Sequence, residues 1–226
     1  VEISAKGLPV LQWEKDQTEA AGLVKIDILG NRSLAVIRDA LEAVRQNTGR
    51  DIDYASWQPL DDARARELLR CGESMGCFYI ESPATRSLLK KLRCDNYLTL
   101  VAASSIIRPG VAKSGMMREY IHRFHNPNKF EYIHPVMKEQ LEETYGVMVY
   151  QEDVLKVCHH FAGLDLGDAD VLRRAMSGKH RGKHEFQRIV DKFFSNCKER
   201  GYPDEVTKEV WRQIESFAGY SFSKAH

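Results

Sequence analysis

The sequence predicts a mainly α fold with a short β edge near its N-terminus. After residue 30, most apolar patterns repeat at helical spacing and follow a Ser, Asp or Asn that can cap a helix. Strand-like content, rich in β-branched and aromatic residues, is confined to three short segments at 23–29, 77–80 and 147–150. These observations indicate a helical fold in which strands have a minor role.

The first predicted element is a buried strand over 23–29. Gly30 ends this apolar run, and Asn31 is expected to cap a helix whose apolar residues recur from Leu34 to Val44. The change from strand to helix predicts a domain boundary near Gly30, which divides the chain into 1–30 and 31–226.

Helices are predicted over most of the remaining chain. Capping residues or helix-starting prolines mark several of them: Asp61 or Asp62, Ser82 with Pro83, Asn96, Ser114 and Pro135. The predicted helical ranges are 62–69, 83–92, 96–107, 116–124, 135–145, 153–161, 168–176, 185–200 and 205–217. Segments 77–80 and 147–150 are predicted as two further short strands.

Composition excludes some classes of protein. Hydrophobic residues make up 43% of the chain, enough for a core, and the formal net charge of +1 gives no global signal for nucleic acid. No apolar run approaches the roughly 20 residues of a membrane helix. The five cysteines show no CxxC spacing, which favours reduced thiols in a cytoplasmic protein. Both termini look like cut ends within a longer sequence.

Lys25 and Asp27 are the first candidates for chemistry. They alternate with apolar residues and therefore share one face of the predicted strand. One interpretation is a structural ion pair or a solvated strand face. The other is a metal-binding carboxylate beside a phosphate-binding ammonium, and because one carboxylate holds Mg²⁺ poorly, the remaining ligands then lie outside this chain.

A basic stretch from Leu172 to Lys192 is the second candidate. Two basic residues, Arg173 and Arg174, end a helical pattern, and others follow: Lys179, Arg181, Lys183, Arg188 and Lys192. The acidic groups near 139–143 and 165–170 are expected to lie elsewhere, so that a basic face is concealed by the near-zero total. The stretch is either a solvated helical face or a phosphate contact, for which arginine offers a planar fork.

Other patterns are less informative. The histidine pairs His122/His125 and His180/His184 lack the companions of a zinc site, and no GxSxG, GxGxxG or Walker A string occurs. Tyr150 and Gln151 follow the strand-like segment 147–150. They indicate either an ordinary strand-to-helix turn with a buried tyrosine or an aromatic and amide pair beside a ligand.

Taken together, these segments resemble the alpha subunit of DNA polymerase III, the bacterial C-family of replicative polymerases. The resemblance covers essentially the whole chain, and eight strings carry it in order: AAGLVKIDILG, PLDD, CFYIES, IIRPG, SGMMREYI, EETYGVMVYQEDV, DADVLRRAMSGK and FAGYSFSKAH.

The resemblance implies a fold and an activity. Residues 1–30 are implied to be the last strip of a palm similar to that of polymerase-beta-like nucleotidyltransferases, and 31–226 to be helical fingers. The last of three catalytic aspartates falls on Asp27, a metal ligand, with Lys25 beside it, and the other two lie upstream. The implied nucleotide-binding residues are Arg108, Ser114, Gly115, Tyr150, Gln151, Arg173, Arg174, Lys224 and His226.

Some positions depart from the family pattern. Ser223 and Ala225 replace the commoner asparagine and serine of FNKSH, and MSGK at 176–179 replaces MGKK. These differences leave open whether the longer protein is the main replicase or an error-prone paralogue.

The resemblance therefore implies a fragment of a DNA-directed DNA polymerase that adds deoxynucleotides to a primer 3′ end with two Mg²⁺ ions. Primer-template DNA, deoxynucleoside triphosphates, a sliding clamp and a proofreading exonuclease subunit are the implied partners, in the bacterial cytoplasm and without a membrane. The alternatives are a non-catalytic helical module that binds nucleic acid and an unrelated helical scaffold.

Overall fold

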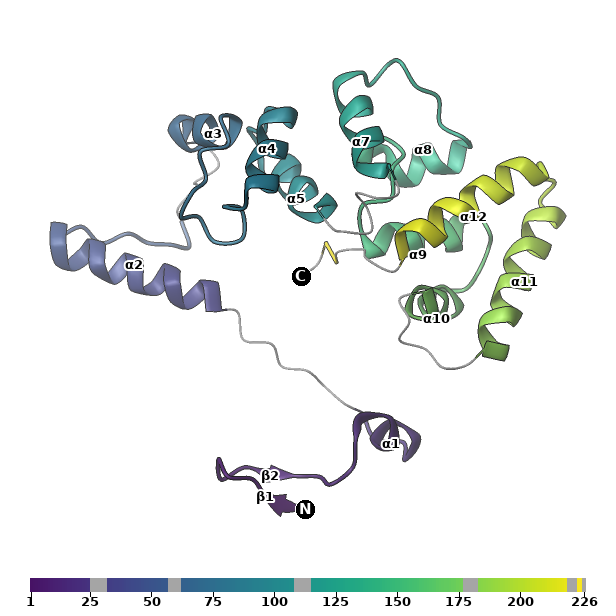
Figure 1. Ribbon diagram of the computed structural model, residues 1–226, viewed down its shortest axis with the longest axis horizontal. Coiled ribbons are helices and arrows are strands. Elements are labelled where there is room, and N and C mark those ends of the chain that lie inside the picture. Colours follow the sequence, from purple (N-terminus) through teal and green to yellow (C-terminus); the bar gives the residue numbers. More distant parts are fainter. Residues whose placement is uncertain (25–31, 57–61, 108–114, 177–182, 219–222, 225–226) are drawn as a thin grey trace. The chain divides into compact units, whose positions relative to one another are not determined.

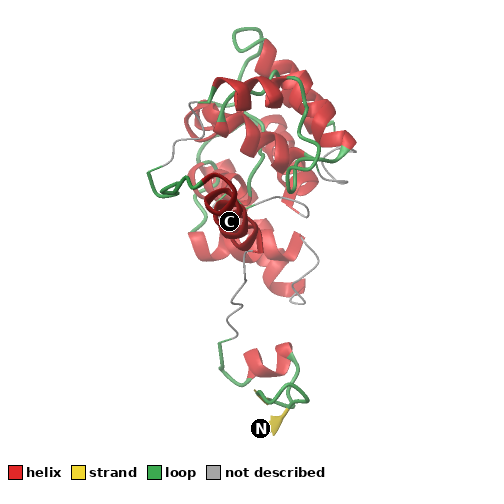
Figure 2. Cartoon of the chain, turned by 90° about the vertical axis from the view of Figure 1, so that its left-hand side faces the viewer, coloured by secondary structure: helices red, strands yellow, loops and turns green. Residues whose placement is uncertain are grey.

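A computed structural model describes residues 1–24, 32–56, 62–107, 115–176, 183–218 and 223–224. Helices dominate these residues, as the sequence predicts, and the described strands form one small antiparallel pair near the N-terminus (Figure 2). The contacts divide the chain into two compact units, Val1–Trp57 and Gln58–His226. The predicted boundary between palm and fingers near Gly30 is a separate question and stays a prediction.

The first unit contains a hairpin and two helices (Figure 1). Strands β1 (Glu2–Ile3) and β2 (Pro9–Val10) pair antiparallel, a feature too short for the sequence pattern to indicate. Helix α1 spans Lys15–Ala20, and α2 spans Arg32–Thr48 as the spacing from Leu34 predicts. The strand expected over 23–29 and the cap expected at Asn31 fall almost wholly outside the described residues.

The second unit holds the remaining helices. They are α3 (Ala63–Arg70), α4 (Pro83–Leu92), α5 (Tyr97–Ile106), α7 (Met116–His125), α8 (Pro135–Leu141), the 3₁₀ turn η2 (Glu142–Thr144), α9 (Gln151–His160), α10 (Leu166–Met176), α11 (Lys183–Glu199) and α12 (Asp204–Ala218). Asp62, Ser82 and Asn96 cap α3, α4 and α5 through their side-chain oxygens, which confirms the predicted starts.

Helix α9 lies at the centre of the packing in the second unit. It contacts α8, α10 and α12, while α4 packs against α3, α5 and α7. Val154, Val157 and Cys158 on α9 have no exposed surface. Phe161, just after the helix, stacks on Tyr202 with 4.7 Å between ring centroids. Burial of this apolar face is what fixes α9, and α9 in turn positions the residues at its N-terminus.

Arg200 closes the other end of α9. Its Nη1 donates hydrogen bonds to the carbonyl oxygens of His160 and Phe161, at 2.7 and 2.8 Å. These carbonyls belong to the last turn, where helix geometry leaves acceptors without helical partners. Gly163 follows with φ of +65°, and a Cβ there would lie 2.4 Å from Arg200 Nη2. A side chain at residue 163 would therefore be strained by the positive φ and would displace the Arg200 guanidinium.

Two predicted strands are wrong. Residues 77–80 form turns: the Ile80 amide donates to the Cys77 carbonyl, and Tyr79 has a positive φ of 71°. Residues 147–149 are buried but form no strand, and Tyr150 is only an isolated β-bridge residue. The amides of Val149 and Tyr150 donate to the Asp153 carboxylate.

One helix start is also corrected. The sequence predicts Ser114 as the cap of the helix at 116–124, whereas Gly115 occupies the N-cap position of α7 with φ of 79° and no side chain to donate or accept. Ser114 itself lies outside the described residues.

None of the helices in the described ranges combines the length and apolar character that a membrane-spanning segment requires.

Candidate functional site

The structure describes six of the predicted site residues: Gly115, Tyr150, Gln151, Arg173, Arg174 and Lys224. The other five lie outside the described residues: Lys25, Asp27, Arg108, Ser114 and His226. Five of the six described residues, all except Gly115, meet around the N-terminus of α9.

Tyr150 and Asp153 form the base of this group. Tyr150 is 2% exposed and Asp153 4% exposed. One oxygen of the Asp153 carboxylate, Oδ2, accepts hydrogen bonds from the amides of Val149 and Tyr150 at 2.8 and 2.9 Å. Burial raises the pKa of the Asp153 carboxyl to about 6, although the two amide donors and Lys156 favour the charged form. The backbone that carries the Tyr150 ring is thus held by a buried acid.

Gln151 connects α9 to the paired arginines of α10. Its Oε1 accepts a hydrogen bond of 3.0 Å from Arg173 Nη1. Asp170 Oδ1 accepts from Arg173 Nε and Nη2 at 3.0 and 2.7 Å, and Asp170 Oδ2 lies 3.0 Å from Arg174 Nε. The Asp170 carboxylate is shared by two guanidinium groups, so Asp170, Arg173 and Arg174 together keep a net positive charge.

The C-terminal segment completes the group. Lys224 Nζ lies 2.5 and 2.6 Å from the two carboxylate oxygens of Glu143 and 5.3 Å from the centroid of the Tyr150 ring. Glu152 accepts hydrogen bonds from Ser223 Oγ at 2.7 Å and from the Lys224 amide at 3.0 Å. Residues more than 70 positions apart are therefore in contact.

A cavity of about 270 Å³ lies beside this group. Tyr150 and Glu143 line it together with Tyr120, Phe124 and Tyr145. The last three rings pack edge-on or tilted against one another, with centroids 5.7 to 6.2 Å apart. The wall next to Tyr150 is therefore aromatic.

Gly115 is not joined to these residues. Its carbonyl accepts the Glu119 amide at 3.1 Å within α7, and a Cβ at residue 115 would meet no heavy atom within 4 Å among the described residues. A nucleotide contact by Gly115 stays a prediction.

The expectation that acidic groups lie apart from the basic stretch is wrong for the group at 165–170. Asp168 pairs with Arg188 at 2.8 Å and with Lys192 at 2.6 Å, and Asp165 lies 3.1 Å from Lys192. The Asp168 amide and then Lys192 lower the pKa of the Asp165 carboxyl to about 2. Arg188 and Lys192 therefore tie α11 to α10, and both of these cations of the basic stretch are paired with carboxylates.

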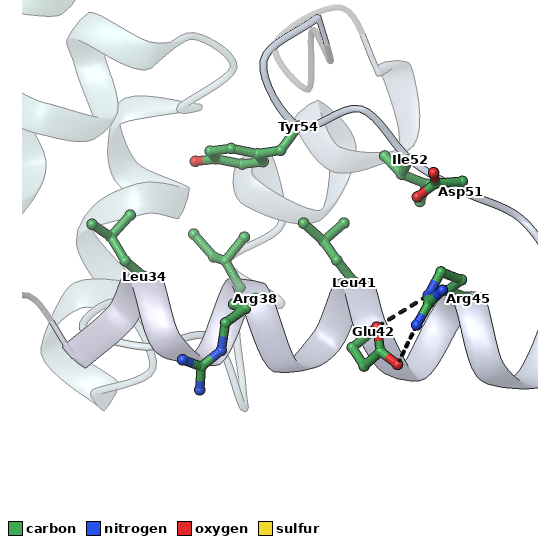
Figure 3. Close-up of a pocket in the computed structure, with 9 residues that line it drawn as sticks. Leu34, Arg38, Leu41, Glu42, Arg45, Asp51, Ile52 and Tyr54 are labelled. Carbon is green, nitrogen blue, oxygen red and sulfur yellow. Dashed lines mark hydrogen bonds and ion pairs between the residues drawn. The ribbon is translucent and has the colours of Figure 1, made fainter.

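A second cavity, of about 370 Å³, lies in the first unit along α2 (Figure 3). Leu34, Leu41 and Tyr54 point into it, and at one end Glu42 Oε1 pairs with Arg45 Nη2 at 2.8 Å. It contains none of the predicted nucleotide-binding residues. Within the described ranges, no three His, Cys, Asp or Glu side chains are grouped so that they could hold a metal ion.

Four acidic residues of the site were not among the predicted site residues. Asp170 stands three and four positions before the two arginines, a spacing that predicts helical ion pairs. Asp153 stands three positions after Tyr150, as in a capping box, and this spacing could have identified Asp153 from the sequence. Glu143 and Glu152 act on residues about 70 to 80 positions away, and no local pattern predicts that.

Comparisons with known proteins identify the family of this chain. Residues 33–201 match the family described as bacterial DNA polymerase III alpha subunit finger domain. DNA polymerase III subunit alpha of Staphylococcus aureus (strain COL) is 40% identical over 215 residues, which are 95% of this chain and 20% of that protein. The same subunit of Aquifex aeolicus (strain VF5) is 40% identical over 221 residues, 98% of this chain and 19% of that protein.

The chain thus spans about a fifth of the length of the relatives it matches. The family match covers well over half of the chain and includes α9, α10 and most of the contacts described above. The chain therefore belongs to the bacterial DNA polymerase III alpha subunit family, as a fragment from its finger domain region.

Proposed function

We propose that this chain supplies part of the nucleotide-binding face of a DNA-directed DNA polymerase, which adds deoxynucleotides to a primer 3′ end. The observation that carries the proposal is the linked group of Gln151, Arg173, Arg174 and Asp170. In phosphoryl transfer the protein mainly positions the triphosphate and stabilises its charge, and such a group is suited to both tasks.

Arg173 and Arg174 are the proposed phosphate clamp. Three hydrogen bonds from Arg173 to Asp170 and Gln151 hold its guanidinium in one orientation, and its side chain is 20% exposed. Arg174 is half exposed and shares the same carboxylate. A pre-oriented guanidinium loses less rotational freedom when it binds a phosphate, which favours the arginine pair over the exposed lysines.

Lys25 and Asp27 belong to the proposal through family membership alone, since both lie outside the described residues. Asp27 is the proposed ligand of Mg²⁺ and Lys25 a phosphate contact. When bound, two Mg²⁺ ions activate the attacking 3′ oxygen and stabilise the leaving pyrophosphate. On this view residues 1–30 end the palm and 31–226 form the fingers.

The proposed partners follow from the same family. They are primer-template DNA, deoxynucleoside triphosphates and, for the longer protein, a sliding clamp and a proofreading exonuclease subunit, in the bacterial cytoplasm. Arg108, Ser114, Gly115 and His226 are proposed as further nucleotide contacts.

Triphosphate binding by the 226-residue chain tests the proposal. Isothermal titration calorimetry with dATP and Mg²⁺ should show binding that the double change Arg173→Ala/Arg174→Ala weakens by about ten- to a hundred-fold, because charge-assisted hydrogen bonds to phosphate are lost. Arg45→Ala/Arg212→Ala is the matched control, since both residues also form i,i+3 ion pairs and the net charge falls equally.

The outcomes separate the candidate functions. Equal weakening by both double variants would indicate a general charge effect and overturn the clamp. DNA binding that falls steeply with salt, without any triphosphate binding, would support the helical nucleic-acid-binding module instead.

A further inference from the structure

Lys224 is held by two acidic residues in two different ways. Its backbone amide donates to Glu152, at 3.0 Å, whereas its ammonium pairs with both oxygens of Glu143, at 2.5 and 2.6 Å. Ser223 Oγ donates to the other Glu152 oxygen at 2.7 Å. The position of the Lys224 backbone and the pairing of its charge thus depend on separate residues.

The Glu152 contacts fix the backbone beside Tyr150. Both Glu152 oxygens are used, one by Ser223 and one by Lys224, so the segment is attached at two points. Glu152 also stands in the first turn of α9, where the helix dipole favours a carboxylate. The backbone of Lys224 is therefore held in one position, whichever way its ammonium points.

The Glu143 contact is of a different kind. The side chains of Lys224 and Glu143 are 36% and 44% exposed. An ion pair this accessible to water shifts an equilibrium by only about two- to five-fold. A phosphate group carries more charge than a carboxylate, so it can take the ammonium from Glu143, and Glu143 then acts as a competitor for the same cation.

We infer that Glu152 positions Lys224 for a phosphate of the nucleotide, and that Glu143 lowers nucleotide affinity by competing for the Lys224 ammonium. This inference rests on the proposed function and adds two residues to it. The two acids have opposite effects, so removing their charges changes affinity in opposite directions.

The test compares Glu143→Gln with Glu142→Gln in the 226-residue chain. Both changes remove one negative charge from η2, but of the two only Glu143 pairs with Lys224 in the described structure. Calorimetry with dATP and with inorganic triphosphate should give a Kd about two- to five-fold lower for Glu143→Gln than for Glu142→Gln. The difference should disappear when Lys224→Ala is added to each variant.

Glu152→Gln tests the positioning role. It should raise the Kd by about ten-fold, and it should have no effect in a Lys224→Ala background, where there is no ammonium to position. General destabilisation would not make the effect of Glu152→Gln depend on the presence of Lys224. Circular dichroism and thermal melting identify any variant that fails to fold, and in that case the Glu143 comparison decides alone.

The outcomes distinguish this inference from the proposed function. If the unmodified chain binds no triphosphate, or if Arg173→Ala/Arg174→Ala leaves binding unchanged, the proposed function fails and this inference with it. If binding depends on the arginines but Glu143→Gln matches Glu142→Gln, or its effect persists without Lys224, only the roles of Glu143 and Glu152 are overturned.

Discussion

Asp153 makes the stability of the second unit depend on pH in a direction opposite to that of most carboxylates. Burial raises the pKa of its carboxyl from 3.8 to about 6. A carboxyl with a raised pKa contributes stability that is complete below the unfolded value and is lost as pH rises through the folded value. A difference of about two pKa units corresponds to roughly 3 kcal/mol, of which about 2 kcal/mol falls between pH 4 and pH 7.

The change Asp153→Asn isolates this effect, because asparagine keeps the shape and an acceptor oxygen but does not titrate. The free energy of unfolding of Asp153→Asn, minus that of the unmodified chain, should rise by about 2 kcal/mol from pH 4 to pH 7. Urea denaturation measures this quantity. Trp211 packs against Phe193 with ring centroids 5.1 Å apart and so reports on the second unit once Trp13 and Trp57 are replaced by phenylalanine.

The sign of the change in this free-energy difference with pH shows whether burial or hydrogen bonding controls the Asp153 pKa. A difference that stays flat with pH would show that burial and the two amide donors cancel. A difference that falls as pH rises would show that the hydrogen bonds from Val149 and Tyr150 dominate and lower the pKa. Lys156→Met in a chain that keeps Asp153 serves as a control, because it removes the cation that favours the charged form and should raise the Asp153 pKa further.

Three further predictions concern catalysis. Asp27→Asn in the longer polymerase should lower turnover by on the order of a hundred- to a thousand-fold while the melting temperature stays nearly unchanged, and a destabilised but fully active variant would show that Asp27 is only a structural ion-pair partner. Lys25→Ala in the same protein should raise the nucleotide concentration needed for half-maximal primer extension. The 226-residue chain alone should add no nucleotide to a primer, since on the proposed function it holds only Asp27 of three catalytic aspartates and a lone carboxylate binds Mg²⁺ weakly; extension above a blank preparation would contradict this.

Local signals predicted the helices well and the short strands poorly. Caps such as Ser82 and Asn96 act within three residues, so the sequence alone contains the whole interaction. A strand is stabilised by a partner elsewhere, and at 147–150 the apolar pattern is real but the Asp153 carboxylate takes the backbone donors that a partner strand needs. The pattern predicted burial correctly and hydrogen bonding incorrectly.

In the candidate site, too, local contacts were predictable from the sequence and long-range contacts were not. Arg173 and Arg174 were predictable as a basic pair, and Asp170 could have been added from its helical spacing. The contacts of Lys224 with Glu143 and Glu152 depend on how α9 and the C-terminal segment pack, and a single sequence without alignment contains no signal for them. Tertiary packing, rather than local propensity, sets the charge around Lys224.

The Arg200 cap has a consequence for reading sequences of related proteins. At Gly163 a side chain is disfavoured twice, by a φ of +65° and by the guanidinium that closes α9. A glycine retained at this position across relatives would therefore record how a helix ends, not how a nucleotide is joined to DNA. An arginine lost at 200 together with a larger residue gained at 163 would be a paired change in architecture, and it would carry no information about the reaction.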